Sequence, residues 1–365
     1  MTAAVLTLIL VSAVFSSCSG KDGSYAMSLE KTYISGSEYA YYLACYKQYW
    51  LYSLGKTDSK EFWESENEGV KNADRLTEIT RDALKKRLVS AYLFDSYGLS
   101  LTDSELHSID LMIAGMKASS GQSDPIKEDE VFKTLGIDET DLKNIMIKDS
   151  KTGALQDYLY GDEGIRKITD EKTEKFYKEN YYKFKFVYFM DGDFLRDEDG
   201  NIEYTEDGAA KVEEISDERY EEKLALAKKI LSEIREGAPI DGYVDEYSEQ
   251  LEKDDYKNGH YLCYVNEYGT LLSAAVMKLG IGETGLLDTK YGIYVIQRCE
   301  LDDLAWKDPE NEAGNDFYSL SQLVTEEDFD AFTQEYYDKI KINEETVGKY
   351  KMEDLPYTFS WQYMF

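Results

Sequence analysis

Apolar side chains recur at intervals of three and four residues from about residue 37 to residue 182, a spacing that predicts amphipathic helices. The first expected helix carries one apolar stripe, formed by Tyr39, Tyr42, Leu43, Tyr46 and Trp50. A longer helix is expected over 72–97, because Gly98 follows it at the position where glycine favours a helix end. Capping sequences predict three more helix starts, near residues 102, 138 and 169. The chain up to residue 182 is therefore predicted to be all-α.

The spacing changes after this region. Residues 183–189 are rich in aromatic and β-branched side chains and predict a strand, and residues 291–297 predict a second one. An acidic stretch, 191–218, contains two Asp-Gly turn signals and predicts a loop or hairpin inserted after the first strand. The remaining pattern predicts helices over 222–236, 243–251, 271–279 and 326–340. This order of strand, long helix, short helices and strand indicates an α+β region.

The net charge of the chain limits the classes of partner that it is expected to bind. There are 73 acidic and 41 basic residues, which gives a formal net charge of −32. A field of that sign repels nucleic-acid phosphates and anionic lipid headgroups, and it favours cationic or neutral polypeptides. The simpler interpretation, that the charge only keeps the protein soluble, stays open. We expect no nucleic-acid partner.

The residues that build catalytic and metal centres are scarce. His107 and His260 are the only histidines, so a Ser–His–Asp triad or a multi-histidine metal centre is hard to assemble. No two cysteines have the close spacing of a metal or redox motif. The acidic stretch mimics part of an EF-hand loop, but Leu195 falls on the first ligand position. The sequence therefore predicts no metal site and no cofactor.

The N-terminus has the features of an export signal. The apolar stretch 3–15 is too short to span a bilayer and suits the hydrophobic part of a signal peptide. Ser16 and Ser17 precede Cys18, and small residues before a cysteine at this point resemble the bacterial lipobox. In that arrangement Cys18 takes a diacylglycerol group and becomes the new N-terminus. The alternative is a plain secretory signal with an incidental cysteine. Both interpretations place the mature protein outside the cytoplasm.

Several segments resemble the parvulin-type foldase lipoproteins, the PrsA/SurA-like group. The helix starts at 99–106 and 168–171 resemble those of the chaperone domain in that family. More specifically, Asn258–Leu262 resembles the family's Gly-Gly-x-Leu-Gly turn, and Leu279–Leu286 resembles its Leu-x-x-Gly-Glu-Ser-x-Val segment. Asp288–Ile296 resembles its Thr-x-x-Gly-x-His-Ile-Ile strand. These segments follow the first strand in the order and spacing of the family.

The resemblance implies an α+β protein in two parts. A helical SurA-N-like chaperone domain would carry an inserted parvulin-like domain, in which helices flank a four-stranded antiparallel sheet. The C-terminal helix would pack on the chaperone domain. The expected divisions are a lipoprotein signal peptide (1–18), a tether (19–36), the helical chaperone domain (37–182), the parvulin-like domain (183–300) and a C-terminal linker and helix (301–365).

The family's two strand histidines are absent here. Phe186 takes the place of the first and Tyr294 the place of the second. Prolyl isomerisation breaks no covalent bond, and its barrier falls when donors meet the twisted amide in an apolar pocket. Tyr294 is therefore the one candidate catalytic donor. With Phe186, the resemblance implies a proline-binding surface at Tyr261, Tyr268, Leu272 and Met277. The alternative is that these are ordinary core residues of a degenerate domain.

The resemblance implies a membrane-anchored folding factor that binds unfolded or newly secreted polypeptides, with weak or lost prolyl isomerisation. The crowded tyrosines near residue 40 suit loose binding of unfolded chains, although core packing explains them equally well. A solute-binding lipoprotein is disfavoured because no alternating βαβ pattern is present. A structural envelope lipoprotein remains the other alternative. The sequence leaves the oligomeric state open.

Overall fold

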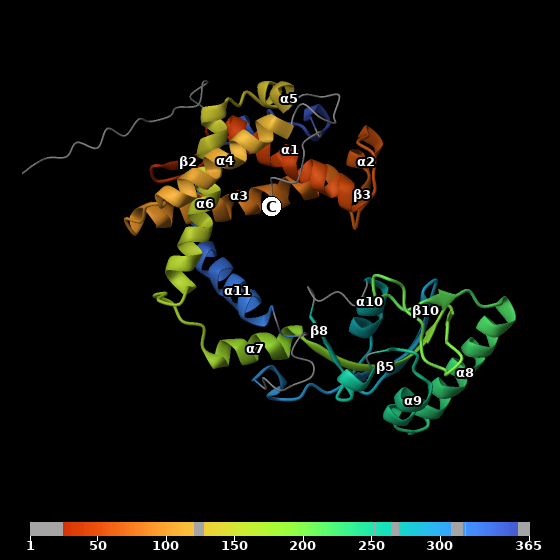
Figure 1. Ribbon diagram of the computed structural model, residues 1–365. Coiled ribbons are helices and arrows are strands. Elements are labelled where there is room, and N and C mark those ends of the chain that lie inside the picture. Colours follow the sequence, from red (N-terminus) through yellow and green to blue (C-terminus); the bar gives the residue numbers. More distant parts are fainter. Residues whose placement is uncertain are drawn as a thin grey trace, which may run out of the picture. The chain divides into compact units, whose positions relative to one another are not determined.

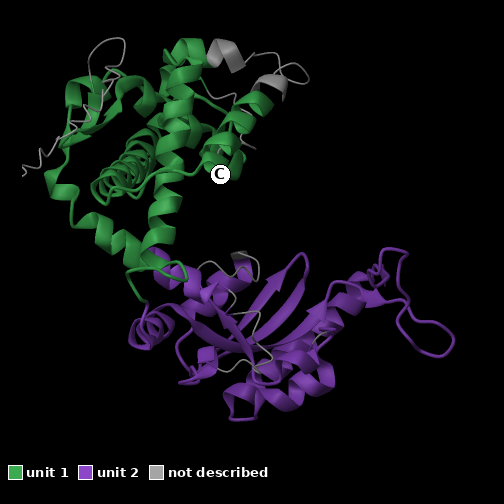
Figure 2. Ribbon diagram, turned by 60° about the vertical axis from the view of Figure 1, so that its left-hand side comes forward, with its two compact units in different colours: residues 1–167, 327–365 green, residues 168–326 purple. Residues whose placement is uncertain are grey.

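The computed structural model describes residues 25–119, 128–251, 253–263, 270–307, 317 and 319–356. The chain separates into two compact units. Unit 1 combines residues 1–167 with 327–365, and unit 2 is the continuous segment 168–326 (Figure 2). Unit 2 is thus inserted, in sequence, between two parts of unit 1. The divisions expected from the sequence at 182/183 and 300/301 both fall within unit 2.

Unit 1 is mainly helical. The sequence prediction of helices in this part of the chain is confirmed, and capping boxes begin two of them, Ser35 with Glu38 and Asp138 with Asp141. Buried apolar faces of these helices meet in one core. The helices are α1 (Gly36–Ser53), α2 (Lys60–Glu64), α3 (Asn72–Ser96), α4 (Asp103–Ser119), α5 (Glu128–Leu135), α6 (Glu139–Tyr160) and α12 (Glu344–Val347), with a two-stranded hairpin of β3 (Glu66–Asn67) and β4 (Val70–Lys71).

A small sheet in unit 1 is absent from the sequence prediction. β1 (Tyr25–Leu29) pairs antiparallel with β2 (Thr32–Ser35) and with β11 (Lys341–Ile342). The sequence predicts a tether through residue 36, but residues 25–35 form two of these three strands. Their third partner lies near the other end of the chain, so no local pattern reveals the pairing.

A buried lysine ties α1 to the C-terminal segment. The side chain of Lys47 is fully buried, and its Nζ donates to the carbonyl oxygens of Met352 at 2.7 Å and Leu355 at 2.8 Å. Asp58 pairs with the same ammonium at 2.9 Å. A buried ammonium persists only when it is paired in this way. Lys47 therefore has a structural role.

Helix α11 (Leu320–Gln334) lies about six residues before the helix expected over 326–340. Leu320, Leu323 and Val324 are all buried, so the apolar pattern of this helix begins earlier than the sequence analysis assumes. Residues 337–339 form a separate 3₁₀ turn. The helix α7 (Asp170–Asn180) belongs to unit 2, where its Phe176 packs in the same apolar cluster as Leu320.

Unit 2 is built on a four-stranded antiparallel sheet, which confirms the predicted α+β fold class (Figure 1). The strand order is β8-β5-β10-β9. The strands are β5 (Tyr182–Met190), β8 (His260–Leu262), β9 (Thr284–Thr289) and β10 (Gly292–Cys299). The helices of this unit, besides α7, are α8 (Asp217–Arg235), α9 (Ile240–Tyr247) and α10 (Thr270–Lys278).

The side chains of β5 alternate between two apolar layers. Val187 and Phe189 pack with α8 and α9 on one face of the sheet. Phe184 and Phe186 pack with α10 on the other face. This alternation is the period of two that a strand imposes on its side chains. Both faces of the sheet are therefore covered by helices.

The acidic insertion is a hairpin. β6 (Asp193–Phe194) pairs with β7 (Val212–Glu213), and isolated bridges join Arg196 to Ile202 and Tyr204 to Ala210. Gly200 and Gly208 have φ of +85° and +86°, the left-handed conformation that favours glycine in turns. The Asp-Gly signals in the sequence therefore mark the two turns of this segment.

His260 is a core residue of unit 2. It is 4% exposed, and its ring centroid lies 4.1 Å from that of Tyr256 and 4.9 Å from that of Phe186. Burial lowers the pKa of His260 from 6.5 to about 4. The imidazole is therefore neutral at pH 7 and stacks as an aromatic ring.

Because the imidazole of His260 is buried, we expect the free energy of unfolding to be sensitive to acid. Between pH 6.5 and about 4, the unfolded chain binds a proton on this residue that the folded chain does not bind. The free energy of unfolding therefore falls as the pH is lowered through this window, by up to about 3 kcal/mol from this group. Urea titrations of the parent and a His260→Phe variant, from pH 7 to pH 5, measure it. The gap between the two proteins is expected to shrink or invert as the pH falls.

The exposed His107 supplies the matched control. A His107→Gln variant removes the other histidine and shows whether a change in the pH profile is specific to the buried position. Parallel pH profiles for the parent and the His260→Phe variant would contradict a neutral, buried His260.

Candidate functional site

An aromatic cluster lies on the α10 face of the sheet. Tyr294 of β10 is opposite Tyr188 of β5, with 4.7 Å between their ring centroids. The ring of Phe186 lies 5.6 Å from that of Tyr294. Leu272 of α10 is 6% exposed and belongs to the same cluster. Three of the residues predicted from the sequence, Phe186, Leu272 and Tyr294, are therefore brought together.

Tyr188 is a member of this cluster that the sequence analysis missed. Its hydroxyl donates to the carbonyl oxygen of Tyr291 at 2.7 Å, and it shares a hydrogen bond with the Tyr294 hydroxyl. Tyr188 stands two residues after Phe186, so the strand period alone places both rings on one face. That period was the signal that could have identified it.

The two phenols are neutral donors. Burial, and then the neighbouring Tyr294, raise the pKa of Tyr188 well above its ordinary value. Burial also raises the pKa of Tyr294, and the hydrogen bond with Tyr188 offsets part of that rise. A neutral phenol can donate a hydrogen bond to a carbonyl oxygen, but it does not relay protons near pH 7 as an imidazole does.

The other predicted residues lie elsewhere. Tyr261 is 1% exposed, its ring packs 4.9 Å from Phe317, and its hydroxyl bonds to the carboxylate of Asp302. In β8, His260 and Leu262 face α10, so the alternation of the strand turns Tyr261 to the opposite side. Met277 is 37% exposed on α10. Tyr268 and Cys18 lie outside the described residues.

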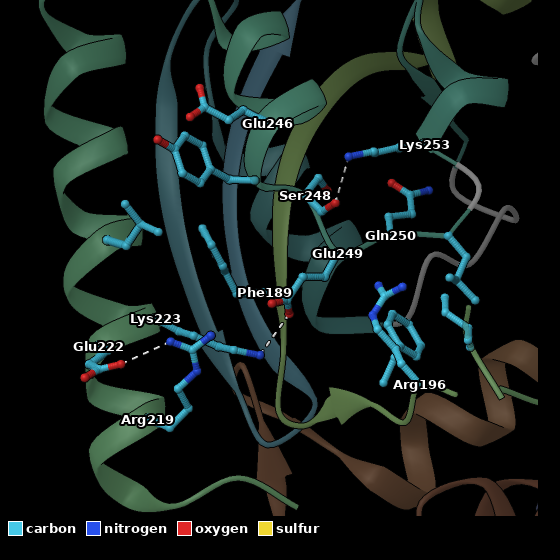
Figure 3. Close-up of a pocket in the computed structure, with 15 residues that line it drawn as sticks. Phe189, Arg196, Arg219, Glu222, Lys223, Glu246, Ser248, Glu249, Gln250 and Lys253 are labelled. Atoms are coloured by element: carbon cyan, nitrogen blue, oxygen red, sulfur yellow. Dashed lines mark hydrogen bonds and ion pairs between the residues drawn. The ribbon is translucent and has the colours of Figure 1, made fainter. Parts of the chain in front are cut away.

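A large cavity opens on the opposite face of the sheet, the face that α8 and α9 cover. Its volume is about 600 Å³, and it lies between β5, the inserted hairpin, α8 and the segment that follows α9 (Figure 3). Apolar side chains from each of these elements line it: Phe189, Phe194, Ile202, Leu226, Tyr247 and Leu251. The sequence analysis missed this cavity because it forms only where the hairpin, β5, α8 and the segment after α9 come together in the fold.

Two cations that line the cavity, Lys223 and Arg219, pair with carboxylates. Lys223 donates to the carbonyl oxygens of Met190 at 3.0 Å and Gly192 at 2.7 Å, and it pairs with Glu249 at 3.0 Å (Figure 3). Arg219 pairs with Glu222 at 3.1 Å. Arg196 and Lys253, which also line the cavity, donate to backbone carbonyl oxygens. The apolar walls and these polar groups together fit an amphipathic ligand.

Two further searches of the described residues gave no site. No group of three or more His, Cys, Asp or Glu side chains among them is arranged to hold a metal ion. None of the described helices has the length and apolar composition needed to span a bilayer.

Comparisons with known proteins give a likeness in structure only. No family model matches the sequence, and no curated protein matches it significantly. Solved structures do match. PrsA from Bacillus subtilis is 15% identical with a TM-score of 0.24, and the match covers 78% of this chain and 92% of that chain.

Two more structures match in the same way. The peptidylprolyl isomerase PrsA from Bacillus anthracis is 19% identical with a TM-score of 0.26, over 72% of this chain and 99% of that chain. The foldase protein PrsA from Streptococcus pneumoniae is 13% identical with a TM-score of 0.24, over 78% of this chain and 98% of that chain. At these identities and TM-scores the matches establish neither a family nor an activity for this chain.

Proposed function

We propose that this protein is an extracytoplasmic folding factor that binds unfolded secreted polypeptides and has weak or no prolyl isomerase activity. The observation that supports it best is the aromatic cluster of Phe186, Tyr188 and Tyr294. Three strands of its sheet, β8, β9 and β10, overlap the sequence segments that resemble parvulins. The cluster keeps an apolar surface at the positions of the family's histidines.

Binding without efficient catalysis follows from the chemistry of this cluster. The phenol of Tyr294 can donate to a substrate carbonyl only by giving up its hydrogen bond to Tyr188, and Phe186 supplies only apolar contact. A site with fewer aimed donors stabilises the twisted amide less, while it still holds apolar side chains. The proposed activity is therefore transient capture of unfolded chains. The net charge of −32 favours clients that are cationic or neutral.

Exposed apolar residues extend this surface beyond the cluster. Leu271 and Met277 on α10 are 59% and 37% exposed, and Ile281 just after the helix is 60% exposed. Exposed apolar residues that gather on one element are typical of protein-binding surfaces. We assign this outer face of α10 to client binding.

The anchor is the second part of the proposal. A lipid on Cys18 would hold the protein at the outer side of the cell membrane, where secreted chains emerge unfolded. A Cys18→Ser variant is expected to move from the membrane fraction to the soluble fraction. If the variant stays with the membrane as the parent does, the anchor proposal fails.

The activity is tested by two assays on the same preparation. The protein is expected to suppress the aggregation of a reduced, unfolded secreted protein at near-stoichiometric ratio. Its catalysis of cis–trans exchange in a proline tetrapeptide is expected to be at least about 100-fold below that of a parvulin with both histidines. Absence of aggregation suppression, or tight binding of one small solute instead, would overturn the proposal.

Paired surface variants locate the binding surface. A Leu271→Asp/Met277→Asp variant is expected to lose aggregation suppression at least about threefold, because charges oppose apolar contact. The matched control is Leu111→Asp/Met112→Asp on α4, where the same residue types are 59% and 40% exposed. All four side chains are exposed, so both variants are expected to fold. An equal loss in the two variants would contradict client binding at α10.

A further inference from the structure

Successive residues of β5 direct their backbone N–H and carbonyl groups alternately toward β8 and toward β10. The N–H of Tyr188 donates to Ser248 Oγ at 3.1 Å, and its carbonyl oxygen accepts from the N–H of Glu249 at 2.8 Å, both on the β8 side. The N–H of Asp191 donates to the carbonyl oxygen of Tyr291, on the β10 side. In an antiparallel sheet, the N–H and the carbonyl of one residue point toward the same neighbouring strand, and those of the next residue point toward the other strand. The backbone groups of all even-numbered residues of β5 therefore point toward the β8 side.

The ladder of backbone hydrogen bonds on the β8 side of β5 is interrupted at Phe186, and we call this interruption the ladder gap. His260 of β8 is in register with Phe184, and Ser248 and Glu249 cover Tyr188. Between these points the chain leaves β5 after Glu249, forms a 3₁₀ turn over Lys253–Tyr256 and returns at His260. Within the described part of the chain, no residue is in register with Phe186 on this side.

A hollow occupies the gap. Its volume is about 130 Å³, and its walls include Phe186, Gln250, Tyr256 and His260. Gln250 also borders the larger cavity, where Figure 3 shows its side chain beside β5. Phe186 is 7% exposed, and a buried backbone group without a partner costs about 1–3 kcal/mol. The hollow has room for several water molecules, which would satisfy this residue when nothing else is bound.

The backbone N–H and carbonyl oxygen of Phe186 at the hollow are complementary to an amide group. One N–H and one carbonyl oxygen, offered side by side in strand geometry, match a group that carries an acceptor and a donor at the same spacing. Of the charged residues that line the hollow, Lys185 pairs with Asp241 at 2.5 Å, and Lys253 donates to the carbonyl oxygen of Asp245 at 2.8 Å. A single residue of a polypeptide fits both the hydrogen bonds and the volume.

We propose that the ladder gap at Phe186 is a docking subsite for one residue of a polypeptide, which enters between His260 and Ser248 and pairs its own N–H and carbonyl with those of Phe186. The subsite rests on the proposed function, because it names the form in which a client chain binds. Main-chain pairing of this kind gives affinity without demanding a particular sequence. It therefore suits a protein that binds many unfolded chains.

The test reads the Phe186 amide directly. Labelling the whole chain with ¹⁵N-phenylalanine gives signals from 14 residues, and a Phe186→Leu variant assigns the one that matters. In the free protein this amide is expected to exchange with solvent much faster than those of Phe184 and Phe189, whose backbones address β8 and β10. Saturating acetyl-Val-Ala-Val-amide is expected to slow its exchange at least about tenfold.

A ligand-side control isolates the hydrogen bonds. The same tripeptide with a methyl group on the alanine nitrogen keeps its side chains and loses the donor, so it is expected to leave the Phe186 amide unprotected. The inference is overturned if Phe186 exchanges as slowly as Phe184 in the free protein, or if the methylated peptide protects it equally.

The outcome is separable from that of the proposed function. Aggregation suppression together with an unprotected Phe186 amide would contradict the docking subsite and support the proposed folding-factor function. Protection of the Phe186 amide without aggregation suppression would support the subsite and contradict the proposed function. The Leu271→Asp/Met277→Asp variant is expected to keep the protection, because its substitutions lie on α10 rather than at the ladder gap.

Discussion

The architecture of unit 2 depends on β5 being an inner strand, paired with β8 on one edge and β10 on the other and covered by helices on both faces. Because its side chains alternate, Val187 is committed to the α8 face, and Phe186 and Tyr188 are committed to the α10 face. A slip of one residue would exchange the two layers, so the register with β10 is fixed by burial. The aromatic cluster, the large cavity and the ladder gap are three consequences of this one strand.

The cluster also limits the chemistry of the unit. Aromatic rings keep the apolar surface, and the neutral phenols of Tyr188 and Tyr294 keep hydrogen-bond donors, but no imidazole extends from these two strands. His260 does lie against Phe186, yet burial keeps it neutral and stacked, which fits a packing role. This composition is the reason that we propose binding of unfolded chains with little or no prolyl isomerisation.

The sequence predicted most of what local periodicity can encode. The strands near 183 and 291 and the helices of unit 1 were visible because their spacing is regular over many residues. The resemblance assigned Phe186 and Tyr294 to the places of the family's two histidines, and in the structure their ring centroids lie 5.6 Å apart in an edge-on arrangement. The placement of Tyr261 was not predictable in the same way, because β8 has only three residues and all are buried. The N-terminal strands and the large cavity depend on partners distant in sequence, which no local pattern records.

The most direct measurement of the central claim is site-specific photo-crosslinking to an unfolded secreted protein, from a photoreactive side chain placed at position 277 or, for comparison, at position 112. Both positions carry a methionine of similar exposure. If unit 2 binds unfolded chains on the α10 face, crosslinks form from position 277 well above the yield from position 112. Equal yields, or crosslinks from position 112 alone, would contradict client binding by the sheet unit.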